Sequence, residues 1–298
     1  MEKVVNGLVS CIIPTYKRCD TLVRAVNSVL NQTYPNVEVL VVNDNEPEDE
    51  YTVQVKNALL VFKDEPRVRL IMQEKHVNGA MARNVGIKAA LGEYIGFLDD
   101  DDEWESEKAE HQVRYLQEHP EVDACACLCS TYYKGIKKWE ASPYTNENLQ
   151  FNVLLRQVGI GTPAFLGKKA CVINTPMFNT RLLRHQELQF FVDFLEKYNI
   201  GILNEHLVKV HGDDATNRPN LKNIVNRKRE WFHEMDAVIK KYSIYNRYRI
   251  ICAHVFEVLL IAIRQRNFSY IIKCACYVNI FIPAYVDLIR RFKSRNNK

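Results

Sequence analysis

The sequence predicts an α/β fold in which a mostly parallel sheet is flanked by helices, followed by a C-terminal helical extension. Two observations predict the sheet. Apolar runs of strand length alternate with segments of helical periodicity through the first half of the 298 residues, and polar residues follow each run, as expected where buried parallel strands end. A third observation sets the extension apart, since the last third consists of long helical segments rich in Lys and Arg. We therefore expect two parts, residues 1–216 and residues 217–298.

The first half repeats a strand and helix pattern. The continuous apolar runs carry no alternation of polar residues, which favours strands buried on both faces. The helical segments begin near Asp20 and near the Asn78-Gly79 turn, where the side chains favour helix starts and turns. The predicted elements are strands at 8–16, 37–42, 68–72 and 94–98 and helices at 20–32 and 80–90, with weak helicity in 46–64.

The second half is less regular. An amphipathic helix closed by Pro120 precedes a strand that carries three cysteines at alternate positions, and the polar stretch 135–152 is expected to be a loop. The remaining predicted elements are strands at 122–133, 170–173 and 206–210 and helices at 105–119, 188–198, 220–242, 245–266 and 268–292.

Composition limits the classes of function. The net charge of +4 indicates no nucleic-acid partner. Residues 1–7 are too short and polar for a cleavable signal, so the chain is expected to begin in the cytosol. The odd number of cysteines, nine, and the spacing of Cys125, Cys127 and Cys129 on one strand face suit buried reduced thiols rather than zinc or disulfides. Reduced thiols agree with a cytosolic location.

Five consecutive acidic residues, 99–103, follow the fourth predicted strand. Carboxylates this close are tolerated where they are solvated, partly protonated or neutralised by a cation. A divalent ion bound through oxygen, with positions open for substrate phosphates, is one neutraliser; a solvated acidic turn is the alternative. Residues 14–16, Asp44 and the acidic residues all lie at the carboxyl ends of predicted strands, where ligands bind in such sheets.

Four segments carry a resemblance to a known family: residues 10–18, 41–44, 78–86 and 92–104. In this order and spacing they resemble the family-two glycosyltransferases with the GT-A fold. The resemblance covers about the first 215 residues. It implies a GT-A catalytic domain over residues 1–216 and says nothing specific about the tail.

The resemblance implies a nucleotide-diphosphate sugar donor, most simply a UDP-sugar. Its base would be held by Pro14, Tyr16, Arg18 and Asp44, since a carboxylate reads an imide N–H and a tyrosine offers a flat face. Arg83 resembles the family arginine near the base and phosphates. The alternative for Arg83 is an ordinary surface position on a helix.

The triplet Asp99-Asp100-Asp101 corresponds to the family's Asp-X-Asp signature. It implies that Asp99 and Asp100 lie on the donor, with Asp99 on the ribose side, and that Asp101 binds Mn²⁺ or Mg²⁺ at the diphosphate. A metal there takes up the charge of the departing nucleotide. His211 resembles a residue that completes this site in some relatives, and its alternative is a structural histidine. Asp102 and Glu103 are assigned no chemistry.

Glu187 is the expected catalytic base. The family commonly places an aspartate in a Glu-Asp or Gln-Asp pair before an aromatic residue and a helix, whereas here Gln186-Glu187 is followed by Leu188. The carboxylate can still accept a proton from an acceptor hydroxyl, with a reach one methylene longer. The alternative is a glutamate favoured by the positive end of a helix.

The resemblance thus implies an inverting glycosyltransferase of the hexosyltransferase type. The cytosolic start, the reduced thiols and the basic apolar tail, rather than any motif, suggest that the enzyme is peripheral on the cytoplasmic face of the membrane and acts on a glycan or lipid-linked acceptor in surface polysaccharide synthesis. The C-terminal helices would lie in the membrane interface or pack as a hairpin on the catalytic domain. Two other functions remain: a degenerate transferase serving as a membrane-attached partner, and a sugar-nucleotidyltransferase, although residues 14–18 lack the glycine-rich phosphate loop that it needs.

Overall fold

A computed structural model describes residues 4–212 and 220–278. The chain divides into two compact units. The first unit contains Met1–Glu147, Ile160–Arg181 and Gln186–Ala215, and the second contains Asn148–Gly159, Leu182–His185 and Thr216–Lys298. The second unit thus includes two segments, 148–159 and 182–185, that precede the C-terminal residues in sequence.

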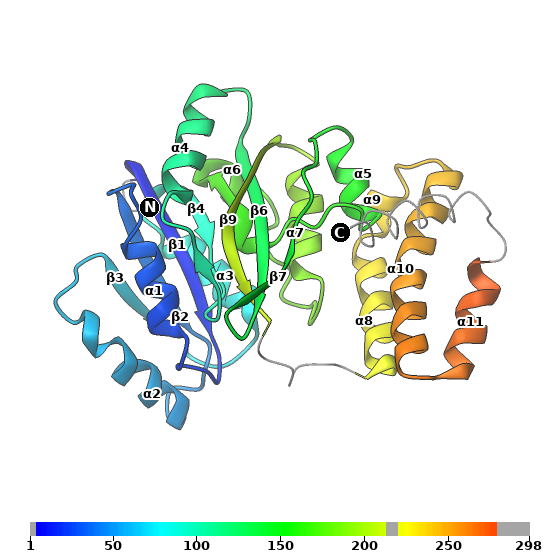
Figure 1. Ribbon diagram of the computed structural model, residues 1–298, viewed down its shortest axis with the longest axis horizontal. Helices are drawn as coiled ribbons and strands as arrows, with labels where there is room; N and C mark the ends of the chain where they lie inside the picture. The colour runs from blue at the N-terminus through cyan, green and yellow to red at the C-terminus, as the bar shows by residue number, and fades with distance from the viewer. Residues whose placement is uncertain (1–3, 213–219, 279–298) are drawn as a thin grey trace. The chain divides into compact units, whose positions relative to one another are not determined.

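The first unit is built on one mixed sheet, shown in Figure 1. Its strand order in the described residues is β3-β2-β1-β4-β8-β6-β9-β5, with β7 paired to β6. The strands are β1 Val5–Thr15, β2 Val37–Asn43, β3 Val68–Met72, β4 Gly92–Phe97, β5 Glu103–Trp104, β6 Ala124–Tyr133, β7 Ile136–Glu140, β8 Phe165–Lys168 and β9 Ile200–His211. β1 to β4 are parallel, as predicted, and β8 joins β4 to β6 by antiparallel pairing. The predicted fold class is therefore confirmed.

Three helices share a core with one face of the sheet: α1 (Leu22–Leu30), α2 (Glu50–Leu59) and α4 (Lys108–Glu118). The apolar residues of α1 recur at helical spacing and are buried in this core. β2 is buried along its whole length, which explains its unbroken apolar run. Cys125 and Cys127 of β6 are buried free thiols, and burial raises the pKa of Cys127 to about 11. This agrees with the reduced thiols expected from their spacing.

On the opposite face, α3 (Gly79–Ala89) packs closely on β1. A methyl group at Gly86 would lie 2.4 Å from Cγ2 of Ile12, so only glycine allows this approach. Nearby, the ring of Phe97 in β4 contacts those of Phe178 and of Phe190 in α7 (Gln186–Phe194). These contacts fix α3 and α7 against the strand that leads into the acidic residues.

Two elements of the first unit differ from the sequence predictions. The strand expected at 170–173 is instead the helix α6 (Lys169–Ile173), and β8 precedes it. β8 pairs with Ile95 and Gly96 of β4, and its Phe165 and Leu166 are buried. Strand pairing and burial therefore favour a strand at 165–168 rather than at 170–173. The predicted loop at 135–152 contains β7, which the sequence does not signal because Ile136 and Trp139 are exposed.

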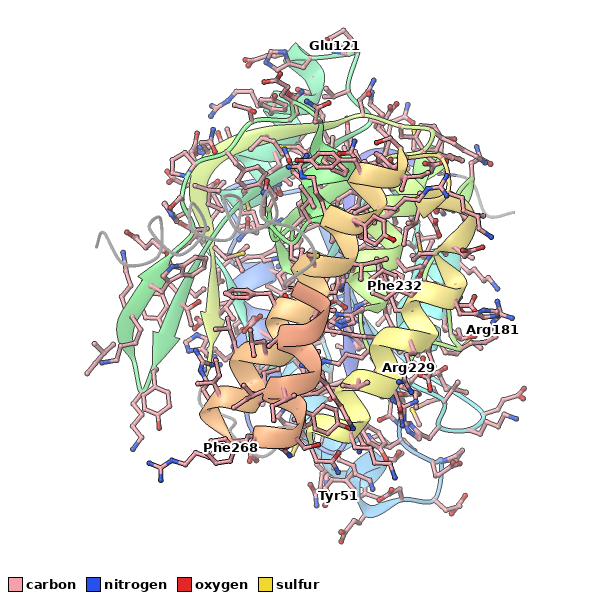
Figure 2. All side chains as sticks on the ribbon, turned by 90° about the vertical axis from the view of Figure 1, so that its right-hand side faces the viewer. Tyr51, Glu121, Arg181, Arg229, Phe232 and Phe268 are labelled. Atoms are coloured by element: carbon pink, nitrogen blue, oxygen red, sulfur yellow. The ribbon has the colours of Figure 1, made fainter. Side chains whose placement is uncertain are left out.

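The second unit is helical. It contains α5 (Leu149–Leu154), α8 (Leu221–Glu234), α9 (Asp236–Ile239), α10 (Ile244–Arg264) and α11 (Phe268–Val278), with the short helices η1 Leu60–Phe62 and η2 Thr162–Ala164 belonging to the first unit. Figure 2 looks onto α8, α10 and α11, which share a small apolar core. Within the described residues, no helix combines the length and apolar character needed to cross a bilayer. Residues 279–292 of the expected last helix and the basic residues 290–295 lie outside the described residues.

Candidate active site

The first part of the site is a buried carboxylate at the end of β2. Asp44 is 2 % exposed, and its Oδ1 accepts hydrogen bonds from Gln73 Nε2 at 2.6 Å and from the Val77 N–H at 3.1 Å. Burial raises the pKa of Asp44, and the Val77 hydrogen bond and the nearby His76 oppose this rise. His76 Nδ1 lies 3.1 Å from Oδ2. The carboxylate is thus held in a fixed orientation.

An aromatic stack covers this carboxylate. The ring of Tyr16 lies 4.0 Å from that of His76 with an interplanar angle of 12°. Tyr16 follows β1, in which Pro14 is paired with Val42 of β2, and it remains 40 % exposed. A flat exposed ring beside a buried acceptor is suited to a heterocyclic base. The structure therefore brings Pro14, Tyr16 and Asp44 together, as predicted from the sequence.

Arg18 joins this region to the acidic loop, residues 99–103. Its two guanidinium nitrogens bind different carboxylates: Nη2 lies 2.8 Å from Asp100 Oδ1, and Nη1 lies 2.7 Å from Asp101 Oδ2. Burial raises the pKa of Asp100 to about 6, although the charge of Arg18 opposes the rise. The loop formed by residues 16–18 therefore contacts both the base side and the acidic side of the site.

Arg83 lies on α3 and pairs with the first residue of the acidic loop. Its Nη2 is 2.6 Å from Asp99 Oδ1, and its guanidinium lies 5.6 Å from the ring centre of Phe178. The Arg83 side chain is only 14 % exposed, so it is not an ordinary surface helix residue. Asp99 is 38 % exposed and remains accessible to a ligand.

The end of the acidic loop holds His211. Asp102 Oδ1 accepts a hydrogen bond from the His211 N–H at 2.9 Å, and Glu103 Oε1 lies 2.7 Å from His211 Nε2. The sequence analysis gave Asp102 and Glu103 no chemistry, whereas the structure shows that both orient His211. Burial raises the pKa of Asp102 to about 8, and the charge of Asp99 adds to this rise.

The charge of the acidic loop fits a cation. Arg18 binds Asp100 and Asp101, Arg83 binds Asp99, and Arg24 lies near Glu103, so this loop has more carboxylates than guanidinium groups. In the described part of the chain no three His, Cys, Asp or Glu side chains are arranged to hold a metal ion. Magnesium is commonly bound by one or two carboxylates together with substrate phosphates. The excess of carboxylates at this loop fits such an ion.

Glu187 is the second residue of α7 and is partly buried. Its neighbour Gln186 lies near Gly79 at the start of α3, since a methyl group at Gly79 would be 3.9 Å from Gln186 Oε1 and 3.2 Å from Arg83 Nη1. The start of α7 therefore lies beside the helix that carries Arg83. The structure brings the predicted base to the same side of the sheet as Asp99.

A hydrogen-bonded segment positions α7. Asn84 of α3 exchanges two hydrogen bonds with the backbone of Phe178, at 2.8 and 3.0 Å. Asn78 Nδ2 donates to the Thr180 carbonyl at 2.8 Å, and Gln189 of α7 accepts from the Asn179 N–H at 2.7 Å. The segment before α7 is thus fastened to α3 on one side and to α7 itself on the other.

Three side chains of the site were not predicted. Gln73 and His76 lie in the polar stretch after β3, and their position at the carboxyl end of a parallel strand is a signal that could have identified them. Arg24 lies on α1, and its guanidinium donates to the Asp101 carbonyl. Its place in the amphipathic pattern of α1 gave no such signal.

A parallel half-sheet that carries, at its carboxyl edge, a buried carboxylate beside an exposed aromatic ring and an acidic loop is the arrangement of a nucleotide-dependent α/β enzyme. Comparison with known families is consistent with this class. Residues 10–176, more than half of the chain, match the model of glycosyl transferase family 2. The chain belongs to this family.

Relatives at the sequence level are bacterial. An uncharacterized glycosyltransferase of Rickettsia felis is 29 % identical over 70 % of this chain and 34 % of its own length. The Escherichia coli UDP-Glc:alpha-D-GlcNAc-diphosphoundecaprenol beta-1,3-glucosyltransferase WfgD is 39 % identical over 37 % of this chain and 41 % of its own length. The chain spans about a third of the length of the first curated relatives that it matches.

Solved structures share the fold. S. aureus TarS 1–349 in complex with UDP-GlcNAc superposes with a TM-score of 0.62 at 17 % identity, covering 83 % of this chain and 71 % of that chain. The mannosyltransferase PcManGT from Pyrobaculum calidifontis in complex with GDP-Man and Mn²⁺ superposes with a TM-score of 0.60 at 14 % identity. The superposition covers 97 % of this chain and 87 % of that chain. The predicted GT-A fold is therefore confirmed.

Proposed function

We propose that this protein is an inverting glycosyltransferase that transfers a hexose from a UDP-sugar to a hydroxyl group of a glycan or lipid-linked acceptor. The observation that carries the proposal is the loop of residues 16–18. Tyr16 stacks on His76, which contacts Asp44, and Arg18 binds Asp100 and Asp101. A nucleotide whose base lies at Tyr16 would place its diphosphate toward the acidic loop.

In this proposal the donor is bound by residues from three strands. Asp44 accepts a hydrogen bond from the imide N–H of uracil, and Pro14 and Tyr16 contact the base on its other sides. Asp99 and Asp100 lie on the ribose and diphosphate side, where Arg18 and Arg83 supply positive charge. Asp101 and His211 would hold Mn²⁺ or Mg²⁺, and such an ion, when bound, takes up negative charge on the leaving diphosphate. The Mn²⁺ complex of PcManGT supports this assignment.

Glu187 is the proposed general base. Its carboxylate accepts the proton of the acceptor hydroxyl while the oxygen displaces the nucleotide diphosphate from the opposite face of the anomeric carbon. A single displacement inverts the configuration. The fastening of residues 178–180 to α3 supports this role, since it holds the start of α7 in place beside Arg83.

The acceptor and location are proposed from the relatives. The name of WfgD describes a glucosyltransferase that acts on a diphosphoundecaprenol-linked sugar. We place the present chain in the same kind of pathway, the synthesis of a surface polysaccharide or lipid-linked glycan, with the protein peripheral on the cytoplasmic face of the membrane. The basic helical unit is suited to an anionic lipid surface.

The test is direct. The purified chain is incubated with a panel of UDP-, GDP- and other nucleotide sugars, with Mn²⁺ or with a chelator, and nucleotide release and thermal stabilisation are measured. We expect binding and slow nucleotide release with a UDP-sugar only when the metal is present. Absence of metal-dependent binding with every donor would refute the transferase, whereas binding without turnover in the presence of acceptor lipids would favour a degenerate, non-catalytic role.

A further inference from the structure

The second unit contains a cavity of about 300 Å³, which is at the small end of ligand sites. All the residues that line it belong to this unit. They come from α8, from α10, from residue 156 just after α5 and from residues 184–185. Figure 2 faces the helices α8 and α10 that carry most of them.

The cavity is strongly cationic. Its lining includes four basic side chains and one carboxylate, so the formal charge is +3 with histidine neutral. The charged residues are Arg156, Arg184, Lys228, Arg264 and Glu257. A small space lined by one sign of charge attracts ligands of the opposite sign.

The single carboxylate is already engaged. Glu257 Oε1 lies 3.0 Å from Arg156 Nε, and Oε2 lies 2.7 Å from Lys228 Nζ. Burial alone would raise the pKa of Glu257, but the charges of Arg156 and Lys228 outweigh it and hold the pKa far below its usual range. Within residues 4–212 and 220–278, neither Arg184 nor Arg264 has an acidic partner. These two guanidinium groups therefore remain for a ligand.

His185 supplies a second, independent observation. It lines the cavity and is 7 % exposed, yet its Nε2 has no hydrogen-bond partner in the part of the chain that the structure describes. Its φ of 62° is in the left-handed region, which is unfavourable for a residue with a side chain. A buried ring nitrogen without a partner destabilises the fold unless a ligand binds it.

The rest of the lining is apolar. Ile224 of α8 and Leu260 and Ile261 of α10 complete the wall. Beyond the cavity, Ile263 at the end of α10 and Phe268 at the start of α11 are 52 % and 75 % exposed, and Phe268 is labelled in Figure 2. An anion bound here would therefore lie beside apolar surface, as the phosphate group of a lipid does.

We propose that this cavity binds the diphosphate group of an isoprenoid-linked acceptor, with Arg184, Arg264 and His185 contacting the phosphate oxygens and the apolar wall contacting the first part of the chain. Guanidinium groups are suited to phosphate oxygens because they donate two parallel hydrogen bonds. This inference rests on the proposed transferase function and names its acceptor class. It also gives the second unit a defined role, that of an acceptor-binding module.

The test uses the full chain at physiological salt. Binding of farnesyl diphosphate, inorganic pyrophosphate and farnesol is measured by calorimetry, and binding to phosphatidylglycerol vesicles by co-sedimentation. The variants are Arg184→Gln with Arg264→Gln, His185→Asn, and Arg229→Gln as the control. Arg229 is exposed on α8 next to Lys228 and does not line the cavity (Figure 2). Asparagine tolerates the left-handed backbone of position 185.

We expect farnesyl diphosphate to bind more tightly than pyrophosphate and farnesol not to bind. The double arginine variant should weaken farnesyl diphosphate binding about 10–100-fold, since charge-assisted hydrogen bonds are lost, and Arg229→Gln should leave it unchanged. Equal weakening by Arg229→Gln, or no binding to the unaltered protein, would overturn the proposal. Equal affinities for pyrophosphate and farnesyl diphosphate would indicate an anion site without lipid recognition. A double variant that weakens vesicle binding but not farnesyl diphosphate binding would indicate a membrane contact. Either result also overturns the proposal.

Thermal stabilisation by a UDP-sugar with Mn²⁺ is measured on the same samples. Stabilisation retained without farnesyl diphosphate binding would refute only the acceptor site. If a UDP-sugar with Mn²⁺ does not stabilise the unaltered protein, the proposed transferase function is refuted. Should His185→Asn fail to fold, the double arginine variant decides the matter, because both of its side chains are exposed.

Discussion

Asn84 and the backbone of Phe178 form a reciprocal pair of hydrogen bonds: Asn84 Nδ2 donates to the Phe178 carbonyl at 2.8 Å, and the Phe178 N–H donates to Asn84 Oδ1 at 3.0 Å. The two residues are 94 positions apart in sequence. The pair joins α3, which carries Arg83, to the segment that leads into α7 and Glu187. It therefore connects the donor side of the site with the proposed base.

Asn84→Ala should destabilise the protein and slow catalysis. Both backbone groups of Phe178 would lose their partner in a buried environment, which costs about 2–4 kcal/mol for the two together. Urea unfolding measures the loss, and steady-state kinetics should show a lower kcat because Glu187 is less well positioned. Asn27→Ala, at an exposed position of α1, is the control. A variant with unchanged stability would show that the segment is held by other contacts.

Asp44→Asn should weaken UDP binding about 10–100-fold and reduce the preference for UDP over CDP. The carboxylate that accepts an imide N–H becomes an amide that can also donate, so the discrimination between the two bases falls. Calorimetric titration with UDP and CDP measures both effects. Asp64→Asn, at an exposed side chain, is the control. An unchanged ratio of the two affinities would place the base elsewhere.

Asp101→Asn should abolish the dependence of UDP-sugar binding on Mn²⁺. The variant removes the proposed metal ligand and also one of the two carboxylates bound by Arg18, while Asp100 still binds that arginine. Thermal shifts with UDP alone and with UDP plus Mn²⁺ separate the two effects. Asp20→Asn, an exposed acid near the same loop, should retain the response to the metal. Persistence of the Mn²⁺ effect in Asp101→Asn would exclude Asp101 as the ligand.

Glu187→Gln should lower kcat about 10²–10⁴-fold and leave donor binding nearly unchanged, since the side chain keeps its shape but no longer accepts a proton. Glu187→Asp should retain part of the activity because a carboxylate is preserved. Glu118→Gln, at the exposed end of α4, is the control. A glutamate that only favours the start of α7 would affect stability rather than kcat, so activity near that of the unaltered protein in Glu187→Gln would refute the base.

The parallel half of the sheet was predictable because its physics is local. β2 is buried throughout and therefore reads as an unbroken apolar run, and the polar residues after each strand mark the edge at which a ligand binds. This strand-end pattern and the family resemblance together identified Asp44, Arg83 and the acidic loop as candidate site residues. The structure adds the contacts among them, such as Arg18 with both Asp100 and Asp101.

The features that the sequence did not reveal depend on distant partners. Tyr16 and His76 are 60 positions apart, and neither residue alone signals a stack. Arg156 belongs to the second unit and forms an ion pair with Glu257, 101 positions away. Composition along the sequence does not reveal such a distant contact, so it did not predict that residue 156 belongs with the C-terminal helices. β7 pairs along the edge of β6 with exposed side chains, and its apolar residues show no buried face.

Two buried histidines of the second unit are expected to couple its stability to pH. Burial lowers the pKa of His185 to about 3, and the charge of Lys228 adds to this effect; burial also lowers the pKa of His254 well below its usual value. Both ring nitrogens of neutral His254 have a hydrogen-bond partner: Nδ1 lies 3.2 Å from Lys228 Nζ, and Nε2 lies 3.1 Å from the Leu154 carbonyl. The charged groups that act on the two rings are Lys228, Arg156, Arg184 and Glu257.

Acidification from about pH 7 to about pH 5 should therefore destabilise the second unit. In this range the unfolded chain protonates histidine near pH 6.5, while the folded chain does not, so the unfolded state binds more protons and the free energy of unfolding falls as pH falls. Complete exclusion of the proton corresponds to about 2 kcal/mol per histidine at pH 5. Urea unfolding followed by the fluorescence of Trp231, which stacks on His254, reports on this unit. His185→Asn should reduce the dependence on pH, whereas His119→Gln, at an exposed position in the first unit, should not. A free energy of unfolding that stays constant between these pH values would show that the two rings accept protons in the folded protein.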